Sequence, residues 1–522
     1  MSNLSKVFSA ALDGIEAKLI EVETDLNVGL HSFTIVGLAD KSLSEAKERV
    51  NSALKNSGVK PPNKENRKIV TNLAPADLKK TGSHYDLAIA VGYLLATKQI
   101  KEFDASDKIF VGELALNGTL RSVSGILNFA KLAGAGKFGS IFVPKENAAE
   151  AAIVDGVKVI PVGSLLELIN HLESRSLINE QPKTEIQPSW SSAHHLVDIA
   201  DIKGQENAKR ALMIAAAGGH NLFMQGSPGA GKTMLAQALV SILPPPDLRE
   251  IIEITQLYSA AGQLNGQSFI NWRPFRSPHH GASPVAVVGG GSNPKPGEIS
   301  LAHRGVLFLD ELPEFRRDVL EALRQPLESG QITVSRAKDT AVFPAKFILV
   351  SAMNPCPCGF YGDEDVSAGL GQGKECRCSA YEVFRYQKKV SGPLLDRIDL
   401  QINVPRVKAE ELQNKERNLE SAEAMRKKVK QARDIQKKRF AELGEDILIN
   451  SEMSSKLCDD LIQLDKEANQ FLKDILEKSL ISARGYYRIL KTARTIADLE
   501  ESENVAMGHL AEAFQYRLRE NN

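Results

Sequence analysis

The chain of 522 residues lacks any apolar run as long as the roughly twenty residues that a membrane span requires. Its first residues also lack the charged region followed by an apolar core that marks a secretory signal. These two absences predict a cytoplasmic protein with no membrane-embedded part. They direct attention to enzymes and binding proteins of the cytoplasm.

The chain also lacks a net charge, because 65 Lys and Arg residues balance 65 Asp and Glu residues. Any surface that binds nucleic acid must therefore be local. Cysteine is scarce, with five residues in the whole chain, and this excludes a disulfide framework for a protein of this length. In a reducing compartment, cysteines that cluster indicate a metal site instead.

The patterns along the chain predict a multidomain α/β protein, and its length predicts roughly three domains of about 150 residues. Residues 1–172 alternate strand and helix signals, and residues 173–196 are rich in Ser, Glu, Gln and Pro, which predicts a linker. Residues 197–405 carry the signals for nucleotide binding. Residues 406–522 are charged and predict a helical domain.

Local signals in the first domain are clear at four places. Residues 18–22 and 32–36 have the composition of strands. A capping box at residues 42–45 begins a helix that ends before Gly58. The Asn-Gly pair at residues 117–118 predicts a hairpin. This first domain is therefore predicted to be α+β.

The most specific motif is a phosphate-binding loop, which follows an apolar strand at residues 222–225 and precedes a helix that begins near Lys232. Its glycines let backbone N–H groups turn toward phosphate oxygens, Lys232 reaches the β- and γ-phosphates, and the Thr233 hydroxyl ligates Mg²⁺. The helix adds its N-terminal dipole. The flanking strand and helix argue against the alternative of a merely structural loop. The predicted ATP-binding residues are Gly226, Ser227, Pro228, Gly229, Ala230, Gly231, Lys232 and Thr233.

Two later strands end in polar residues. The apolar residues 305–309 lead to Asp310 and Glu311, and ligands of open α/β sheets bind at this carboxyl edge. Asp310 is predicted to hold Mg²⁺ and Glu311 to polarise the attacking water as general base. Residues 347–353 lead to Asn354, which is predicted to orient that water. The alternatives are two solvated acids after a buried strand, and an Asn that caps the following loop.

In this order and spacing, the loop, the acidic pair and the strand-end Asn resemble the AAA+ ATPases. Residues 391–399 resemble the arginine-finger segment of the magnesium-chelatase and MCM branch of these proteins. The resemblance implies that Arg397 neutralises charge on the γ-phosphate bound by a neighbouring subunit of a ring, six-membered by family analogy. The alternative is a surface ion pair of Arg397 with Asp396 or Asp399.

Residues 482–491 in the helical domain resemble the second sensor of the same proteins. This implies that Arg484 contacts the nucleotide from a C-terminal α-helical lid. Arg488 lies four residues on and shares its helical face, so either arginine fits the role, and a salt bridge that stabilises the lid is the alternative. Residues 201–205 occupy the place where AAA+ proteins approach the adenine.

Four cysteines bracket a Gly-rich loop at residues 356–378, directly after Asn354. Four thiolates can form a closed tetrahedral zinc site that folds a loop unable to bury a core. Reduced free thiols and redox chemistry remain alternatives. Cys458 stands alone and is predicted to be a small buried apolar residue. The predicted zinc ligands are Cys356, Cys358, Cys376 and Cys378.

Residues 273–280 and 296–305 closely resemble the magnesium-chelatase-like branch. With the cysteine pairs and the first domain, the whole chain resembles the YifB/ComM family. That resemblance implies a homo-oligomeric ATPase that uses ATP and Mg²⁺ and is linked to DNA, with branch migration or helicase activity in recombination during natural transformation. The adjacent His279 and His280 lack an evident third ligand, so a structural or substrate-loop role is favoured over a metal site.

The first domain resembles the Lon-protease-like fold in residues 77–82 and 112–118. Lon catalysis needs a serine nucleophile and a lysine base, and the segments at 86–90 and 125–130 lack them. Ser83 and Lys131 lie nearby but out of register with that pair. The resemblance therefore predicts a catalytically inactive domain that serves binding or assembly.

Two basic elements favour a motor that acts on single-stranded or branched DNA. Residues 336–338 (Arg-Ala-Lys) lie between strand-like runs at 331–334 and 341–343, so a hairpin can present them to a central pore. The second element is a basic tract in the helical domain, and the alternative is that it forms a solvated helix face. If the protein holds DNA through its phosphates, the affinity for DNA should fall steeply as the salt concentration rises. Competing functions are a chelatase-type subunit that remodels a metal-inserting enzyme and an ATP-switched scaffold. The second tract comprises Arg426, Lys427, Lys428, Lys430, Arg433, Lys437, Lys438 and Arg439.

Overall fold

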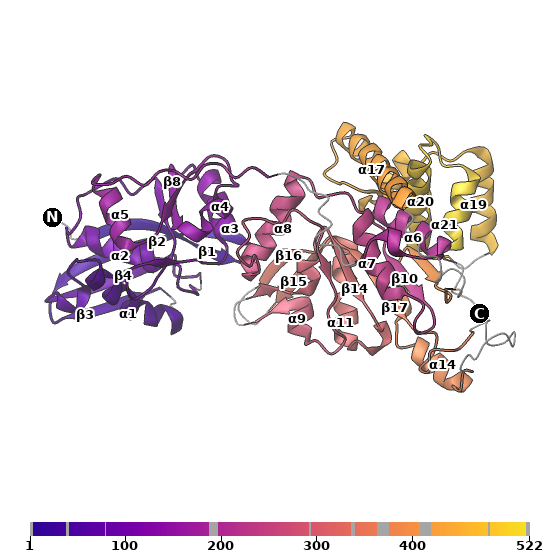
Figure 1. Ribbon diagram of the computed structural model, residues 1–522, viewed down its shortest axis with the longest axis horizontal. Coiled ribbons are helices and arrows are strands. Elements are labelled where there is room, and N and C mark those ends of the chain that lie inside the picture. The colour runs from indigo at the N-terminus through magenta and orange to yellow at the C-terminus, as the bar shows by residue number, and fades with distance from the viewer. Residues whose placement is uncertain are drawn as a thin grey trace.

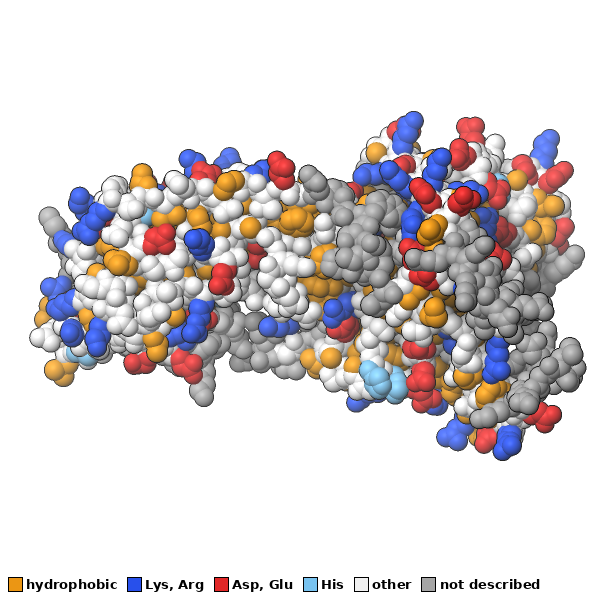
Figure 2. Space-filling view, viewed as in Figure 1, with side chains coloured by type: hydrophobic (Ala, Val, Ile, Leu, Met, Phe, Trp, Pro, Cys, Tyr) orange, Lys and Arg blue, Asp and Glu red, His pale blue; other side chains and the backbone are white. Residues whose placement is uncertain are grey.

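The computed structural model describes residues 4–37, 41–78, 80–186, 197–291, 294–335, 340–362, 375–407, 419–478 and 481–517. Figure 1 shows an elongated molecule with the N-terminal sheet at one end, a second sheet in the middle and the C-terminal helices against that second sheet. Acidic and basic side chains are interspersed over the face in Figure 2, in keeping with the net charge of zero. Among the described residues, every helix is too short or too polar to serve as a membrane span.

A seven-stranded mixed sheet forms the first domain, in the order β3-β4-β2-β1-β5-β8-β9. β1 and β4 flank β2 in antiparallel pairs, whereas β5, β8 and β9 run parallel to one another. The strands are β1 (Leu4–Asp13), β2 (Glu16–Val28), β3 (Ser32–Val36), β4 (Arg67–Ala74), β5 (Lys108–Phe110), β8 (Ser140–Pro144) and β9 (Lys158–Val162), with a separate pair β6 (Glu113–Leu114) and β7 (Leu120–Arg121). The helices are α1 (Lys41–Asn56), α2 (Asp86–Ala96), α3 (Ile126–Ala135), α4 (Ala148–Ala151) and α5 (Leu165–Leu172), with 3₁₀ turns η1 (Pro62–Lys64) and η2 (Lys145–Asn147).

The predicted strands, helix and hairpin of this domain are confirmed, whereas the predicted capping box is not tested. The run at 18–22 lies inside β2, and the run at 32–36 is β3. The helix predicted from residue 42 is α1, and Gly58 after it has a φ of 80°, as a helix-ending glycine should. The side chains of residues 41–44, which include most of the predicted capping box, lie outside those described. The predicted Asn-Gly hairpin joins β6 to β7.

The segment at 173–186 contains no helix or strand. It follows the first domain closely, because the Gln181 N–H donates to the Val159 carbonyl at 2.8 Å and the Thr184 hydroxyl donates to the Ala149 carbonyl at 2.6 Å. Residues 187–196, the rest of the predicted linker, lie outside the described residues.

A five-stranded parallel sheet forms the middle of the molecule, in the order β11-β14-β17-β10-β18. Its strands are β11 (Phe275–Arg276), β14 (Val306–Leu309), β17 (Ile348–Met353), β10 (Leu222–Gln225) and β18 (Leu400–Asn403). The helices of this part are α6 (Glu206–Gly218), α7 (Lys232–Ile242), α8 (Leu248–Ala261), α9 (Pro284–Val288), α10 (Glu298–Leu301), α11 (Arg317–Ala322), α12 (Arg324–Ser329), α14 (Ala380–Gln387) and α15 (Gly392–Leu395), with η4 (Ile199–Asp201) and η5 (Leu312–Glu314). Two short hairpins pair β12 (Gly289–Gly290) with β13 (Lys295–Pro296) and β15 (Gln331–Ser335) with β16 (Thr340–Pro344).

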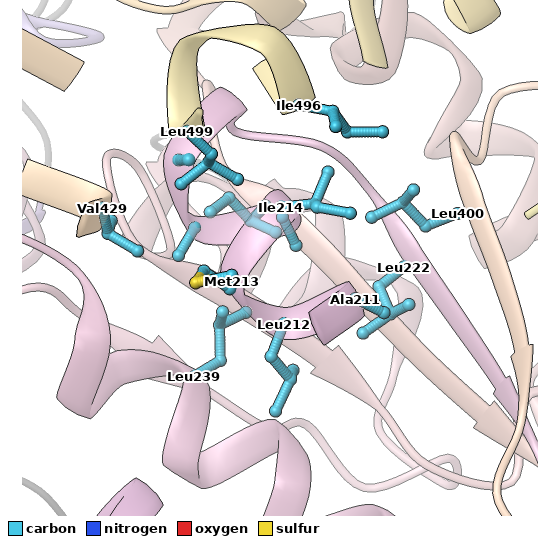
Figure 3. Packing of buried hydrophobic residues seen from close by; sticks show 14 of the residues in the cluster. Ala211, Leu212, Met213, Ile214, Leu222, Leu239, Leu400, Val429, Ile496 and Leu499 are labelled. Carbon is cyan, nitrogen blue, oxygen red and sulfur yellow. The ribbon is translucent and has the colours of Figure 1, made fainter. Parts of the chain in front are cut away.

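The C-terminal helices share a hydrophobic core with this sheet. Figure 3 shows Ile214 of α6 lying among side chains from the sheet and from the C-terminal part, including Leu222, Val429 and Ile496. All four side chains are almost fully buried, so the helical domain is packed against the sheet through α6. Its elements are α17 (Leu419–Glu442), η6 (Asn450–Glu452), α18 (Ser455–Leu461), α19 (Lys466–Lys478), α20 (Ala483–Leu499) and α21 (Met507–Gln515).

The first domain contacts the middle one through α3 and α8. The Ser259 hydroxyl of α8 accepts from the Gly125 N–H at 3.0 Å and donates to Glu150 at 2.5 Å. Glu150 also accepts from the Leu127 N–H at 3.0 Å, and burial raises the pKa of its carboxyl group. A buried, fully bonded polar group of this kind fixes the register of two domains more strongly than apolar contact does. The chain is thus a multidomain α/β protein with a central parallel sheet, as predicted.

Candidate functional site

The phosphate-binding loop follows β10, and its last two residues, Lys232 and Thr233, are the first two residues of α7. Gly229 and Gly231 have φ values of 81° and 87°, which side chains rarely tolerate. A Cβ at Gly226 would lie 2.3 Å from the Val404 carbonyl oxygen, so glycine is required there by space. The phosphate-binding loop therefore has the backbone geometry of a loop that presents N–H groups at a helix N-terminus.

Lys232 is folded into this loop. Its ammonium group donates to the carbonyls of Gly226 at 2.7 Å and Ser227 at 3.1 Å, and to the Asn354 side-chain oxygen at 3.1 Å. Burial lowers the pKa of Lys232, while Asp310 and Glu311 oppose that shift. An ammonium group held by two carbonyls and one amide can exchange these neutral acceptors for phosphate oxygens, which bind it more strongly.

Thr233 and Asp310 meet at the same place. The Thr233 hydroxyl donates to Asp310 at 3.0 Å, and the other oxygen of Asp310 accepts from the Glu311 N–H at 2.9 Å. Hydroxyl and carboxylate oxygens are the ligands that Mg²⁺ prefers, together with phosphate oxygens. The two side chains therefore fit the magnesium role that the sequence predicts for them.

Glu311 projects from the end of β14 in a left-handed conformation, with a φ of 52°. Its carboxylate is half exposed, and one oxygen lies 3.4 Å from Nδ1 of His280. The His280 ring lies 4.1 Å from that of His279, centroid to centroid. Among the described residues, the four clustered cysteines are the only group with the spacing of a metal site. The contact between His280 and Glu311 has no signal in the sequence.

The segment predicted to approach adenine lies at this edge too. Gln205 follows η4 with a φ of 59°, and its side-chain amide donates to the Pro405 carbonyl at 2.5 Å. Pro405 comes shortly after β18, which neighbours β10 in the sheet. Residues 201–205, the phosphate-binding loop, the acidic pair and Asn354 therefore all lie at the carboxyl ends of the parallel strands.

Arg397 lies elsewhere, next to the amino-terminal end of β18. It is only 6% exposed, and it donates to the Pro393 carbonyl and to Glu328 of α12, both at 2.5 Å. Its Nε has no hydrogen-bond partner in the part of the chain that the structure describes. The sequence alternative of a pair with Asp396 or Asp399 is not what the structure shows, because Glu328 takes that place.

The two candidate sensor arginines differ in their partners. Arg488 binds Asp399 at 2.5 Å, and Asp399 is buried and also accepts from the Asn221 N–H at 2.9 Å. Burial opposes the charge of Asp399, but Arg488 and His220 hold its pKa well below the ordinary value. Arg484 is more than half exposed and lies 2.9 Å from Glu328. Arg488 therefore ties the helical domain to the sheet, and Arg484 is the accessible one.

These arginines lie at the opposite edge of the sheet from the phosphate-binding loop. A cavity of about 440 Å³ lies between the sheet and the C-terminal helices, and it is lined by Glu328 and Arg484. The same cavity is lined by the residues before β10, β14 and β18, namely Asn221, Gly305 and Asp399. A four-residue strand spans about 13 Å, so the structure brings Arg397 and Arg484 together with each other and not with Lys232 of the same chain.

The four clustered cysteines converge on one point. Cys356 Sγ lies 3.3 Å from Cys358 Sγ and 3.7 Å from Cys376 Sγ, and ligand atoms of all four, including Cys378, lie within 4.8 Å of one another. A tetrahedral zinc ion with Zn–S bonds of about 2.3 Å places its sulfurs about 3.8 Å apart. The donor set and its spacing therefore fit zinc.

The cysteine loop also touches the phosphate-binding loop. A Cβ at Gly359 would lie 2.6 Å from ring atoms of the Pro228 side chain, so the backbone at Gly359 packs against that ring. The loop that carries the four cysteines therefore lies against one wall of the candidate nucleotide site. Residues 363–374, the Gly-rich centre of the cysteine loop, lie outside the described residues. Cys458 is fully buried, and burial raises the pKa of its thiol to about 11, as expected for an inert apolar residue.

Half of the basic tract on α17 is bound to other parts of the protein. Arg426 binds Asp198, Arg433 donates to the Ala216 carbonyl, Lys437 binds Asp247 and Arg439 binds Asp498. The remaining four cations, which are exposed on α17, are Lys427, Lys428, Lys430 and Lys438. The predicted hairpin is formed by β15 and β16, and its basic tip at 336–338 lies outside the described residues.

Ser83 and Lys131 form hydrogen bonds to different partners. The Ser83 hydroxyl donates to Glu113, and the Lys131 ammonium group donates to Gln256 of α8 at 3.4 Å. Lys80 is buried and donates to the Pro75 carbonyl. Each of these groups thus has a structural partner in the described part of the chain.

Comparison with known proteins gives matches along most of the chain. Residues 198–412 match the family described as magnesium chelatase, subunit ChlI. Residues 22–147 match subunit ChlI of Mg-chelatase, and residues 419–517 match the C-terminal part of that subunit.

Several relatives match over nearly their full length. The chain is 44% identical over 520 residues to competence protein ComM of Haemophilus influenzae, covering 99% of this chain and 97% of the relative. It is 41% identical over 516 residues to YifB of Escherichia coli, with 99% and 97% covered. A shorter match, 28% identical over 189 residues, covers 33% of this chain and 54% of the magnesium-chelatase 38 kDa subunit of Rhodobacter capsulatus.

Proposed function

The chain belongs to the magnesium-chelatase-like family that includes ComM and YifB, and from this premise we propose that it is an ATP-hydrolysing AAA+ motor that acts on DNA. The observation that carries the proposal is the convergence of Lys232, Thr233, Asp310 and Glu311 at one edge of a parallel sheet. Ligand sites of open α/β sheets lie at this edge.

In the proposed reaction, the phosphate-binding loop holds the triphosphate through backbone N–H groups, and Lys232 moves from the loop carbonyls to the β- and γ-phosphates. Thr233 and Asp310 hold the Mg²⁺ that arrives with ATP. Glu311 accepts a proton from the attacking water, and Asn354, 3.1 Å from Lys232, orients that water beside the γ-phosphate.

The site is completed in a ring, which we propose to be a hexamer by family analogy. Arg397 and Arg484 lie at the opposite edge of the sheet from their own phosphate-binding loop. A head-to-tail ring places that edge of one subunit against the loop of the next. Both arginines then neutralise charge on the γ-phosphate of the adjoining subunit. Arg488 is left out of this role because buried Asp399 already holds it.

The proposed substrate is single-stranded or branched DNA, and the proposed reaction is branch migration in recombination during natural transformation. The name of one relative, competence protein ComM, supports this direction. The four exposed lysines of α17 and the β15–β16 hairpin supply the surfaces that would meet phosphates.

We further propose that the first domain is Lon-like in fold and has an assembly role, because Ser83 and Lys131 are engaged by separate partners. The four clustered cysteines would hold zinc as a structural ion. That ion would supply no step of hydrolysis, and it would fix the loop that rests on Pro228.

ATP turnover measured without DNA, with linear DNA and with four-way branched DNA tests the proposal. We expect turnover to rise with DNA and most with branched DNA, together with strand exchange in a gel assay. Glu311→Gln should retain ATP binding and lose turnover by about 10²-fold or more. Glu314→Gln, three residues on at the surface, is the matched control and should behave as the unaltered chain.

Other outcomes identify the competing functions. Turnover that no DNA affects, and that is stimulated only by a metal-inserting enzyme, would identify a chelatase-type subunit. Tight ATP binding with little turnover, unchanged by Glu311→Gln, would identify an ATP-switched scaffold. Either result contradicts the motor.

A further inference from the structure

One carboxylate oxygen joins the two arginines that the proposed ring requires. Glu328 Oε1 accepts from Arg397 Nη2 at 2.5 Å and lies 2.9 Å from Arg484 Nη2. Arg397 belongs to the segment before β18, Arg484 opens α20 in the helical domain, and Glu328 is the next-to-last residue of α12. Three separate parts of the chain therefore meet at one oxygen atom.

In the proposed ring, this carboxylate would compete with a phosphate oxygen of the neighbouring subunit for the same two arginines. Arginine recognises carboxylate and phosphate oxygens with the same planar set of N–H donors. The Glu328 side chain is 43% exposed, whereas that of Arg397 is 7% exposed. The carboxylate thus lies on the solvent side of Arg397, and an incoming γ-phosphate must displace it to reach the guanidinium group.

The helix that carries Glu328 is fastened to the β15–β16 hairpin. The Gln325 side-chain amide donates to the Thr333 hydroxyl at 2.8 Å, and its oxygen accepts from the Thr333 N–H at 3.3 Å. The Ser329 hydroxyl donates to the Gln331 carbonyl at 3.2 Å. Only Gly330, with a φ of 67°, separates helix from strand. A displacement of the hairpin therefore moves Glu328 as well.

We propose that Glu328 is a positioning residue that holds Arg397 and Arg484 until DNA displaces the β15–β16 hairpin. The inference rests on the proposed ring motor and adds its regulation. Without DNA, Glu328 competes with the neighbouring γ-phosphate for both arginines. DNA bound to the hairpin withdraws α12 and frees the arginines, so hydrolysis is coupled to the presence of DNA. A ligand shifts such an equilibrium only through its different affinity for the two states.

A purely structural ion pair makes the opposite prediction. If Glu328 served only to fix Arg397 in place, its removal would leave Arg397 less ordered and lower turnover. The proposal requires that removal of the carboxylate raise turnover without DNA. The sign of the effect on kcat therefore separates the two roles.

The test uses the full-length chain and compares Glu328→Gln with Glu321→Gln. Glu321 lies seven residues earlier on α11 and pairs with Arg324, not with Arg397. We expect Glu328→Gln to raise kcat without DNA by about threefold to tenfold, since the partly exposed carboxylate loses its ion pairs with both arginines. The KM for ATP should stay the same, because the phosphate-binding loop is unchanged. Stimulation by DNA should shrink by the same factor.

Two further variants make the result decisive. Glu328→Asp keeps the charge but shortens the side chain, so it should give an intermediate increase, and it replaces Glu328→Gln if thermal unfolding shows that variant to be unfolded. Turnover equal to or below that of Glu321→Gln would overturn the proposal. Arg397→Ala is measured in parallel. If Arg397→Ala leaves turnover of the assembled protein unchanged, the proposed ring site is wrong. If Arg397→Ala abolishes turnover but Glu328→Gln does not raise it, only the proposed role of Glu328 is wrong.

Discussion

The two edges of the central parallel sheet carry charged groups in different arrangements. At the carboxyl edge, Lys232 is held by neutral oxygens and Glu311 is half exposed. At the amino-terminal edge, cations and acids are paired and largely buried, as in Arg273 with Glu250 and Arg488 with Asp399. One edge has charges ready for an incoming ligand, whereas at the other the charges hold the fold together. Arg397 and Arg484 are the exception at the second edge, because their shared carboxylate is exposed.

If the proposed function is right, this difference means that a single chain holds an incomplete site. Parallel strands collect their carboxyl ends at one edge, so the loops that bind nucleotide gather there. In the same topology, the segment that precedes β18 lies at the amino-terminal edge, and this segment contains Arg397. We therefore expect ATP hydrolysis to require the carboxyl edge of the sheet in one subunit and the amino-terminal edge in its neighbour.

The largest effect should come from Arg397. We expect Arg397→Ala to lower kcat of the assembled protein by about 10³-fold or more, because an arginine finger contributes this much to phosphoryl transfer. Arg488→Lys, which keeps the charge beside Asp399, should lower it far less. Steady-state ATP turnover at saturating ATP and protein provides the measurement.

Mixing two inactive chains tests which edge serves which site. Arg397→Ala keeps its phosphate-binding loop and Lys232→Ala keeps its arginine. If the arginine acts on the neighbour, a randomly mixed ring places an intact loop against an intact arginine at about one interface in four, and turnover returns. The mixed rings must first sediment like the unaltered protein. If they do and turnover still does not return, both edges of the sheet act within one chain.

The next effect concerns stability. Glu250 binds Arg273 through both oxygens at 2.6 and 2.7 Å, and both side chains are nearly buried. Glu250→Gln leaves the Arg273 charge unmatched, which should lower the free energy of unfolding by about 3 kcal/mol. Turnover per folded molecule should change little. Glu206→Gln, at an exposed position, should stay within about 0.5 kcal/mol of the unaltered chain.

The pH dependence of this pair has a definite sign. Burial opposes the charge of Glu250, but the charge and hydrogen bonds of Arg273 outweigh it and lower the pKa from 4.5 to about 2. A carboxyl group with a lowered pKa in the folded state stabilises the protein above its ordinary pKa. The stability difference between the unaltered chain and Glu250→Gln should therefore be full at neutral pH and shrink as pH falls from about 4.5 to about 2. A difference that grows over this range would contradict the pair's role.

A smaller effect should follow loss of the cysteine cluster. Cys378→Ser should lower the zinc content from about one ion per chain, because three thiolates bind it less tightly than four. Since Gly359 presses on Pro228, we expect ATP turnover to fall about tenfold, within the range found when the support of a metal site is altered. Cys458→Ala should keep both the metal and the turnover. Unchanged zinc content in Cys378→Ser would contradict a four-cysteine site.

The sequence predicts the carboxyl edge much better than the other one. The phosphate-binding loop is contiguous, and its strand and helix have the predicted bounds, with β10 at Leu222–Gln225 and α7 beginning at Lys232. Asp310 and Asn354 follow apolar strands, so topology alone brings them to the loop. Local motifs are enough to predict this part of the site, because a parallel sheet places the residues that follow its strands at the same edge.

The opposite edge depends on partners far apart in the chain. Arg397 and Glu328 are 69 residues apart, and no pattern joins them. Arg484 and Arg488 share a helical face, and only the position of Asp399 decides which of them is buried. Such tertiary choices override helical periodicity. The zinc ion and the DNA substrate stay predictions, although the cysteine sulfurs converge as the sequence indicates.

The smallest effects should distinguish lysines of α17 by whether they have an acidic partner on another element. Lys427, Lys428, Lys430 and Lys437 are all exposed, but Lys437 is matched by Asp247 at 2.9 Å. If the exposed lysines contact DNA phosphates, each single change to Gln should weaken DNA binding roughly threefold and reduce the slope of log affinity against log salt by about one. Lys437→Gln should leave the slope as it is, because its charge is already neutralised in the free protein.

The measurement is DNA affinity by fluorescence anisotropy over a series of salt concentrations, with folding checked for each variant. The slope is the more telling quantity, because it counts released counterions and is insensitive to a small loss of active protein. Equal slopes for all four variants would mean that α17 presents a solvated face to water, and the DNA contacts would then have to lie at the β15–β16 hairpin. Since that hairpin is fastened to the helix of Glu328 at the amino-terminal edge, DNA binding there alone would join the two edges of the sheet into one coupled site.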